Sequence, residues 1–171
     1  MLHSAPNNGK IDNIESLPTK GISPSVSSIS DKAVAIKTGE NNSVIKVCNI
    51  DKNLYSVVTA DIRTSEVIIT TKQIEHIKER HPNDYERFSG YFEKILTEPD
   101  YILEANKPNT AFILKTFNTK DENFQLILRL STSNDSENYS NSIITFLKIS
   151  DKKWNKYLRN KKILYKREKK N

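Results

Sequence analysis

Residues 66–82 read EVIITTKQIEHIKERHP, and this stretch predicts a strand that runs directly into a helix. Its first five residues are rich in β-branched side chains, which favour a strand. Thr70, followed three residues later by Gln73, fits a capping box, so we expect the helix over Thr71–Arg80. Pro82 ends the helix, because the residue before a proline is pushed out of α geometry.

The segments on both sides of this unit predict an α+β domain. Before it, Val44–Val47 and Ser56–Thr59 are expected to form short strands, paired as an N-terminal hairpin. After it, a second helix is expected from Asn83 or Asp84 until Pro99. Further strands are expected at Asp100–Glu104, Ala111–Phe117, Phe124–Ser131, Ser142–Ile149 and Ile163–Lys166, with a short helix at Asp151–Arg159. Two helices followed by an antiparallel meander predict helices on one face of a sheet.

Charge is distributed unevenly along the chain. The 171 residues are about one domain's worth and carry a formal charge of +6. Residues 1–54 contribute +1, residues 55–150 contribute −3, and residues 151–171 contribute +8. A basic C-terminal segment attracts phosphate, an anionic membrane or an acidic protein partner. Composition alone does not choose among these partners.

Composition also excludes several classes of protein. No apolar run approaches the ~20 residues needed to span a bilayer, and no secretory signal is evident. Cys48 is the single cysteine, which permits neither an internal disulfide nor a cysteine-based zinc cluster. The Ser-rich N-terminus has no aromatic residue, so residues 1–43 are interpreted as a disordered or variable leader to a domain over 44–171.

The first helix carries the most informative polar residues. His81 lies seven residues after Ile74 and shares the core-facing edge of the helix, with Lys78 three residues before it. Such a pair, at a helix end, could move a proton and stabilise a phosphate. From the pattern alone, a satisfied core histidine beside surface charges is the commoner reason for this arrangement. His76 lies five residues from His81 and diverges from it around the helix, which argues against a metal site.

The strands add further candidates. Alternation places Arg129 on the less apolar face of its strand, while Lys115 shares a face with apolar neighbours. Ser142 and Thr145 are three residues apart and face opposite sides of a regular strand. They could serve one site only if a bulge or a strand end intervenes. Each of these residues could equally be an ordinary solvated or turn residue.

Four blocks of sequence, taken together, resemble a known nuclease family. They are residues 71–82, 99–102, 141–145 and 156–166. Their order is similar to that of the phage-associated branch of the barnase/EndoU/colicin/RelE-like (BECR) nuclease fold. The resemblance covers about residues 44–168 and leaves the N-terminal segment outside.

The resemblance implies a fold and a chemistry. The expected fold is two helices packed on a four-stranded antiparallel sheet, here with an extra C-terminal helix and strand. The expected activity is cofactor- and metal-independent cleavage of RNA, often by a toxin acting on tRNA. In the similar colicin-type tRNases a Lys-x-x-His pair works with a hydroxyl from a later strand, which Lys78, His81 and Thr145 or Ser142 match. The aromatic residue that follows that hydroxyl has no secure counterpart, although Phe146 is near.

We therefore expect a metal-independent endoribonuclease, acting in the cytoplasm or delivered into that of a target cell. The expected partners are RNA and an acidic immunity or antitoxin protein. The residues expected to bind RNA or phosphate are Arg129, Lys115, His76, Arg80 and Lys148. The alternative is a non-catalytic phage structural or RNA-binding module of the same fold. A protein that binds the membrane surface through its basic C-terminal segment is a third, weaker interpretation.

Overall fold

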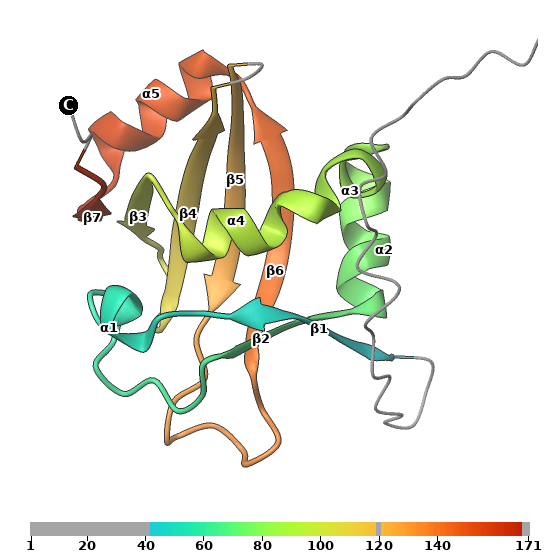
Figure 1. Cartoon of the computed structure of the whole chain (residues 1–171), viewed down its shortest axis with the longest axis vertical. Coiled ribbons are helices and arrows are strands. Elements are labelled where there is room, and N and C mark those ends of the chain that lie inside the picture. The colour runs from blue at the N-terminus through green and yellow to red at the C-terminus, as the bar shows by residue number, and fades with distance from the viewer. Residues whose placement is uncertain (1–41, 119–120, 169–171) are drawn as a thin grey trace, which may run out of the picture.

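The computed structural model describes residues 42–118 and 121–168, which fold around one mixed β-sheet (Figure 1). In chain order the elements are β1 (Val44–Asn49), α1 (Lys52–Tyr55), β2 (Glu66–Thr70), α2 (Thr71–Arg80), α3 (Asp84–Phe88), the 3-10 turn η2 (Ser89–Tyr91), α4 (Phe92–Thr97), β3 (Tyr101–Glu104), β4 (Thr110–Phe117), β5 (Glu122–Arg129), β6 (Asn141–Ile149), α5 (Asp151–Asn160) and β7 (Ile163–Lys166). The predicted leader, residues 1–43, lies outside the described residues apart from its last two positions. No helix in the described ranges is long and apolar enough to cross a membrane.

The sheet has seven strands in the order β1-β2-β6-β5-β4-β3-β7. The predicted α+β class is confirmed, and β3 to β6 are consecutive antiparallel neighbours. The predicted four-stranded antiparallel sheet is wrong, because β1 and β2 extend it on one side and β7 on the other. It is also mixed, since β2 pairs with β6 in parallel through Val67 and Ile68.

The predicted N-terminal hairpin is also wrong. β1 pairs antiparallel with β2, and residues 56–59 form no strand. Asp51 caps the short helix α1 by accepting a hydrogen bond from the Asn53 backbone N–H at 2.8 Å. The Tyr55 hydroxyl then donates to the Leu96 carbonyl at 2.8 Å, which anchors this segment beneath α4. The β-branched residues at 57–59 favoured a strand there, and no local feature indicated that β1 pairs with β2 instead.

Helix α2 is confirmed with the predicted bounds. Thr70 and Gln73 form the capping box: the Thr70 hydroxyl accepts from the Gln73 backbone N–H at 3.3 Å, and the Gln73 amide oxygen accepts from the Thr70 N–H at 2.9 Å. Ile74 and Ile77 are buried. The second predicted helix is divided into α3, η2 and α4, because glycine at position 90 is a weak helix former.

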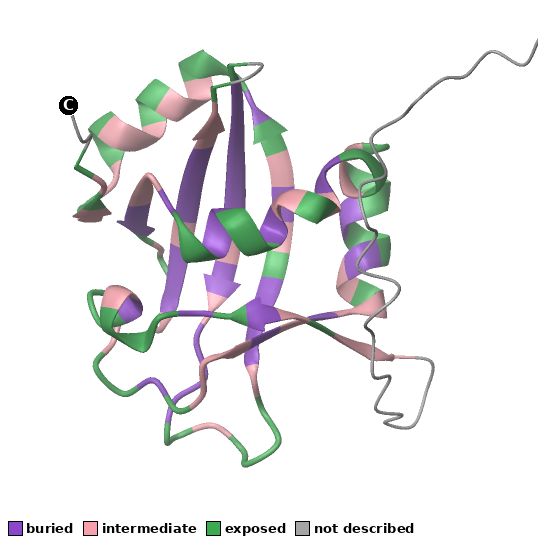
Figure 2. Ribbon diagram, in the orientation of Figure 1, coloured by how far each residue is buried: buried purple, intermediate pink, exposed green. Residues whose placement is uncertain are grey.

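The two faces of the sheet are covered differently. One face, here called the core face, carries Phe124, Leu126 and Leu128, and α4 crosses it (Figure 1). The opposite face, here called the cleft face, is covered over part of its area by α5, whose Trp154 and Tyr157 pack on it. Figure 2 shows β4 and β5 buried over most of their length, while exposed segments interrupt β6. The exposed residues of β6 are Ile144 and Lys148.

Candidate active site

A β-bulge in β6 places two candidate hydroxyls on one face. Ser142 pairs with Arg129 and Thr145 pairs with Ile127, whereas the register shifts between Ile127 and Leu128. Since Arg129 and Ile127 are two residues apart on β5, they share a face, and their partners share it with them. The bulge thus brings Ser142 and Thr145 together on the cleft face, which a regular strand would not do.

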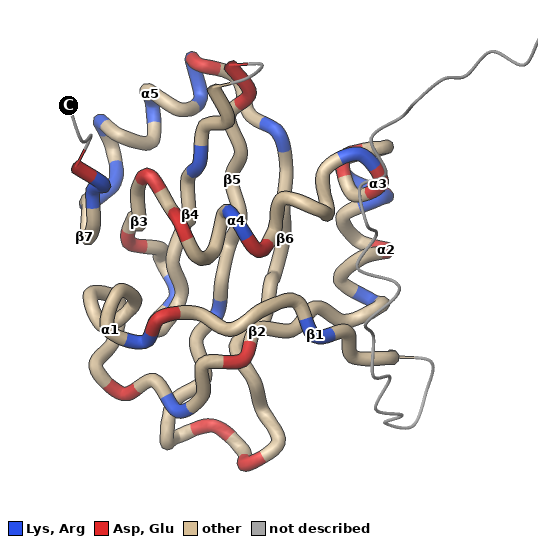
Figure 3. Tube along the Cα trace, in the orientation of Figure 1, with Lys and Arg blue, Asp and Glu red and all other residues tan. Residues whose placement is uncertain are grey.

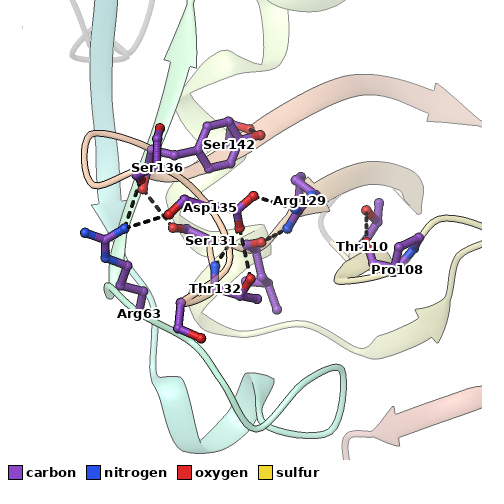
Figure 4. A network of polar contacts seen from close by, with 12 residues as sticks. Arg63, Pro108, Thr110, Arg129, Ser131, Thr132, Asp135, Ser136 and Ser142 are labelled. Atoms are coloured by element: carbon purple, nitrogen blue, oxygen red, sulfur yellow. Dashed lines mark hydrogen bonds and ion pairs between the residues drawn. The ribbon is translucent and has the colours of Figure 1, made fainter.

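The guanidinium of Arg129 is held by the loop that joins β5 to β6. Its Nη1 donates to the Leu130 carbonyl, and its Nη2 lies 2.9 Å from Asp135 Oδ1. Asp135 also accepts from the Thr132 backbone N–H at 2.7 Å. In Figure 4 Asp135 lies between Arg129 and Arg63, whose Nη1 donates to the Asp135 and Ser136 carbonyls at 3.2 and 2.9 Å. A guanidinium fixed in this way is pre-oriented to bind an anion.

Tyr139 completes the cluster around Arg129. Its hydroxyl lies 3.3 Å from the Ser142 hydroxyl, and the Arg129 guanidinium carbon lies 5.7 Å from its ring centroid. The Tyr139 carbonyl accepts from the Ser131 hydroxyl at 2.7 Å. The side chain of Asn141 is buried and bonds to Ser131, Thr64 and Glu66 backbone groups, which fixes the start of β6.

Arg129 and Tyr139 line a cavity of about 460 Å³. The cavity lies between the turn after β3, the end of β5 and the bulge of β6. Its lining residues are Ala105, Asn106, Lys107, Thr110, Phe112, Ile127, Arg129, Tyr139 and Ile144. It combines an apolar floor with the Arg129 and Lys107 cations, a composition typical of binding sites.

The predicted Lys78 and His81 pair lies at the end of α2, which packs beside β6. Lys78 forms an ion pair with Glu86 at 2.8 Å, and its ammonium lies 5.2 Å from the Tyr85 ring centroid. Burial lowers the pKa of the half-buried His81, and the charges of Lys153 and Arg80 lower it further, while Asp84 opposes them. The neutral imidazole, which can accept a proton, is therefore favoured at neutral pH.

The remaining predicted residues divide between the core face and the surface of α2. Lys115 pairs in register with Phe124 on the core face and forms a buried ion pair with Asp100 at 3.2 Å. Lys148 also pairs with Phe124 and lies 2.7 Å from Glu122. His76 and Arg80 are exposed on α2. Arg129, Ser142 and Thr145 are therefore the predicted residues that the fold brings onto the cleft face.

Basic side chains border the covered part of the cleft face. Figure 3 shows them recurring along α5 and around β7. The Lys161 ammonium lies 3.9 Å from the centroid of the Phe112 ring, which lines the cavity. The basic C-terminal segment therefore reaches the rim of the cavity.

Sequence reasoning did not identify Tyr139, Lys107 or Thr110 as site residues. Each lies in or beside a polar turn that was interpreted only as a connection between strands. A signal was present at Tyr139, which is the single aromatic residue between Phe124 and Phe146. An aromatic side chain in an exposed polar loop is a candidate for binding, because loops carry a disproportionate share of functional residues.

Comparison with known proteins agrees with this architecture. The family model described as phage-Barnase-EndoU-ColicinE5/D-RelE like nuclease 2 matches residues 44–166. The chain belongs to this family. The resemblance seen in the sequence is confirmed, and membership in the BECR family indicates a nuclease. No curated protein and no solved structure matches the chain.

Among residues 42–118 and 121–168, no three His, Cys, Asp or Glu side chains lie close enough together to hold a metal ion. Cys48 is buried, and burial raises its pKa to about 12, so it remains a thiol at neutral pH. On the cleft face, the candidate site of this BECR nuclease contains cations, hydroxyls and an aromatic ring.

Proposed function

We propose that this BECR nuclease is an endoribonuclease that works without a metal ion and cleaves on the cleft face. The observation that supports this best is the β6 bulge, which gathers Ser142 and Thr145 beside Arg129. A cation and two hydroxyls are suited to binding a phosphate and to stabilising the charge that develops on it. Their position beside a cavity leaves room for the nucleotide that carries the phosphate.

The proposed reaction uses the substrate's own ribose. The 2′-hydroxyl loses its proton to a base and attacks the adjacent phosphorus, forming a cyclic phosphorane. The bond from phosphorus to the 5′-oxygen then breaks, and an acid protonates that oxygen. The products end in a 2′,3′-cyclic phosphate and a 5′-hydroxyl. DNA has no 2′-hydroxyl and cannot react in this way.

We assign the base to His81, because burial lowers its pKa and favours the neutral imidazole. The Asp84 carboxylate accepts from the Lys148 backbone N–H at 3.1 Å, so the end of α2 borders the far half of β6. Thr145 lies three residues before Lys148, about 10 Å along a strand. RNA that runs along β6 from Ser142 toward Lys148 would place the scissile phosphate near Thr145, with Arg129 binding a neighbouring phosphate and His81 at the end of α2 on the side of the reacting ribose.

Other predicted cations are assigned lesser roles. Lys78 is engaged with Glu86, and Lys115 is buried against Asp100, so we assign both to holding the fold around the site. His76 and Arg80 are exposed on α2 and suited to more distant phosphates, whereas Lys148 is engaged with Glu122.

We also propose a toxin or effector role in a bacterial cytoplasm, with tRNA or another cellular RNA as the target. The basic rim formed by α5 and β7 is suited to an acidic antitoxin, because opposite charges steer association. Induced expression of the full chain in bacteria should then arrest growth, and His81→Ala should relieve the arrest. Equal arrest by both proteins would contradict this role.

The direct test is cleavage of labelled RNA in EDTA by wild type, His81→Ala and Arg129→Ala. Both variants should lose at least about a hundredfold in rate, in line with loss of a general base or a charge-stabilising donor. The matched control is Lys94→Ala, an exposed cation on α4 at the opposite face of the sheet. Wild-type rates for His81→Ala would overturn the proposal.

A non-catalytic RNA-binding module is the second candidate, supported by the +8 charge of residues 151–171. Such a charge binds nucleic acid through counterion release whether or not cleavage follows. This function predicts salt-sensitive RNA binding and no product in the same EDTA assay.

A further inference from the structure

The loop that joins β5 to β6 decides where the Arg129 guanidinium lies. It spans eleven residues, 130–140, and carries Asp135, whose Oδ1 lies 2.9 Å from Arg129 Nη2. Ser133 and Ser136, in the same loop, are exposed. Each residue of such a loop loses conformational entropy when it is ordered, so contacts with other parts of the chain must offset that cost.

The segment that leads from α1 into β2 supplies such contacts. Asp61 Oδ2 accepts from the Ser133 hydroxyl at 2.5 Å and from the Ser133 backbone N–H at 3.1 Å. The Arg63 backbone N–H donates to the Ser131 carbonyl at 2.9 Å. Ile62, between these two residues, is buried in the core and anchors the segment there. The first part of the loop is therefore held against a fixed part of the fold.

The side chain of Arg63 reaches farther along the loop. Its Nη1 donates to the Asp135 carbonyl at 3.2 Å and to the Ser136 carbonyl at 2.9 Å (Figure 4). Hydrogen bonds from a charged donor are stronger than those between neutral groups. Both acceptors belong to the backbone, so this contact fixes the chain at the point from which the Asp135 side chain extends.

Asp135 connects two arginines that come from different parts of the chain. Its carbonyl accepts from Arg63, while its carboxylate accepts from Arg129 Nη2 at 2.9 Å. The same carboxylate accepts from the Thr132 backbone N–H at 2.7 Å. A displacement of the backbone at Asp135 would therefore move the carboxylate and, with it, the guanidinium that is the candidate phosphate ligand.

We infer that Arg63 is a positioning residue for Arg129, acting through Asp135, and that Asp61 holds the same loop at Ser133. The segment before β2 is thereby part of the phosphate-binding apparatus. This inference rests on the proposed function, because it takes Arg129 to bind a phosphate of RNA, and it goes beyond that function by naming the residues that orient this ligand.

The test measures binding apart from cleavage. A short fluorescent RNA with 2′-O-methyl riboses lacks the proposed nucleophile, and anisotropy gives its affinity for the full chain over a range of salt concentrations. Arg63→Ala should lower the affinity at least about threefold and reduce the slope of log affinity against log salt concentration toward that of Arg129→Gln. The double variant should match Arg129→Gln in both quantities, because losses within one coupled unit do not add.

A direct contact between Arg63 and phosphate would give a different result. The two losses would then add, and the slope of the double variant would fall by about 1.4, twice the value of about 0.7 for one contact with a single strand. That result, or wild-type binding by Arg63→Ala, would overturn the inference. The matched control is Lys52→Ala, which removes an exposed cation on α1 and should keep the wild-type slope.

Asp61 tests the inference with a charge of the opposite sign. Hydrogen bonds from the Ser133 hydroxyl and backbone N–H lower the pKa of Asp61, so it is a carboxylate at neutral pH. Asp61→Ala and Asp61→Asn both remove this negative charge, which by itself strengthens binding to RNA. Only the asparagine retains an oxygen that can accept from Ser133.

Asp61→Ala should therefore bind the RNA at least about threefold more weakly than Asp61→Asn, in line with a lost positioning contact. Circular dichroism and urea unfolding establish that each variant is folded, and this pair decides the question even where Arg63→Ala does not fold. Equal affinities of the two Asp61 variants would overturn the inference.

Cleavage of the same sequence with ordinary riboses separates this inference from the proposed function. Binding losses at Arg63 and Arg129 that do not add support the inference even if wild type leaves the RNA intact, in which case the proposed function fails. Cleavage that Arg129→Gln slows and Arg63→Ala leaves unchanged overturns the inference and leaves the proposed function standing.

Discussion

Arg129 and Asp135 form an ion pair at the edge of the cavity, with 2.9 Å between Nη2 and Oδ1. The pair joins the last residue of β5 to the middle of the loop that leads into β6. Asp135 also accepts two hydrogen bonds from Thr132, so one carboxylate orients both the loop and the guanidinium. The candidate phosphate-binding residue and the loop that carries Tyr139 are thus one structural unit.

Asp135→Asn should destabilise the fold in a pH-dependent way. The backbone N–H of Thr132, the Thr132 hydroxyl and Arg129 hold the pKa of the Asp135 carboxyl below its usual range. A lowered carboxyl pKa contributes stability above the unfolded value of about 3.9, and that contribution is lost as pH falls through the folded value. The difference in free energy of unfolding between wild type and variant should therefore be constant near neutral pH and shrink below about pH 4.

Urea unfolding at a series of pH values measures that difference. Glu137→Gln, which changes an exposed carboxylate of the same loop, is the matched control. A difference that grows as the solution is acidified would contradict the assigned role of the Asp135 carboxylate.

Arg129→Gln should weaken RNA binding and reduce its dependence on salt. Loss of one phosphate contact lowers the slope of log affinity against log salt concentration by about 0.7 for a single strand. Fluorescence anisotropy over a range of salt concentrations gives this slope. An unchanged slope would show that Arg129 does not contact phosphate, whatever happens to the affinity.

His81 should set the acidic limb of the pH–rate profile. A base must be neutral to accept a proton, and burial holds the pKa of His81 below its ordinary value of about 6.5. The value of kcat/KM for RNA cleavage should therefore rise with pH through a point below 6.5 and be level at neutral pH. A limb above 6.5 that persists in His81→Gln would assign the base to another residue.

Features encoded by neighbouring residues could be predicted from the sequence. The bounds of α2 follow from the capping box at Thr70 and from Pro82, and its buried face follows from Ile74 and Ile77. The antiparallel order of β3, β4 and β5 follows from the short connections between them, whereas an eleven-residue loop joins β5 to β6. The face that Lys115 shares with its apolar neighbours on β4 follows from the two-residue period of a strand.

Features that depend on distant parts of the chain could not be predicted. The partner of β1 is β2 rather than residues 56–59, and the buried partner of Lys115 is Asp100, fifteen positions away. The bulge that aligns Ser142 with Thr145 depends on the register of β6 against β5. A single sequence has no local signal for such a register. The sequence therefore indicated only that Ser142 and Thr145 would share a face if a bulge were present, and did not predict the bulge itself.

The capping box should contribute measurably to the helix that carries His81. Thr70→Ala removes the hydroxyl that accepts from the Gln73 N–H, and such losses cost about 0.5–2 kcal/mol. Thr70→Ser keeps a hydroxyl and should lose much less. Urea unfolding followed by circular dichroism compares the three proteins, and equal stability of the alanine and serine variants would contradict the capping role.

The central claim is that the substrate's 2′-hydroxyl is the nucleophile. The most direct measurement uses matched RNA oligonucleotides in EDTA, one all-ribose and others with a single 2′-deoxyribose scanned along the strand, with product ends identified by mass spectrometry. We predict 2′,3′-cyclic phosphate and 5′-hydroxyl ends, and no cleavage at the bond next to a 2′-deoxyribose. Equal cleavage at that bond, or products with 5′-phosphate ends, would contradict the account.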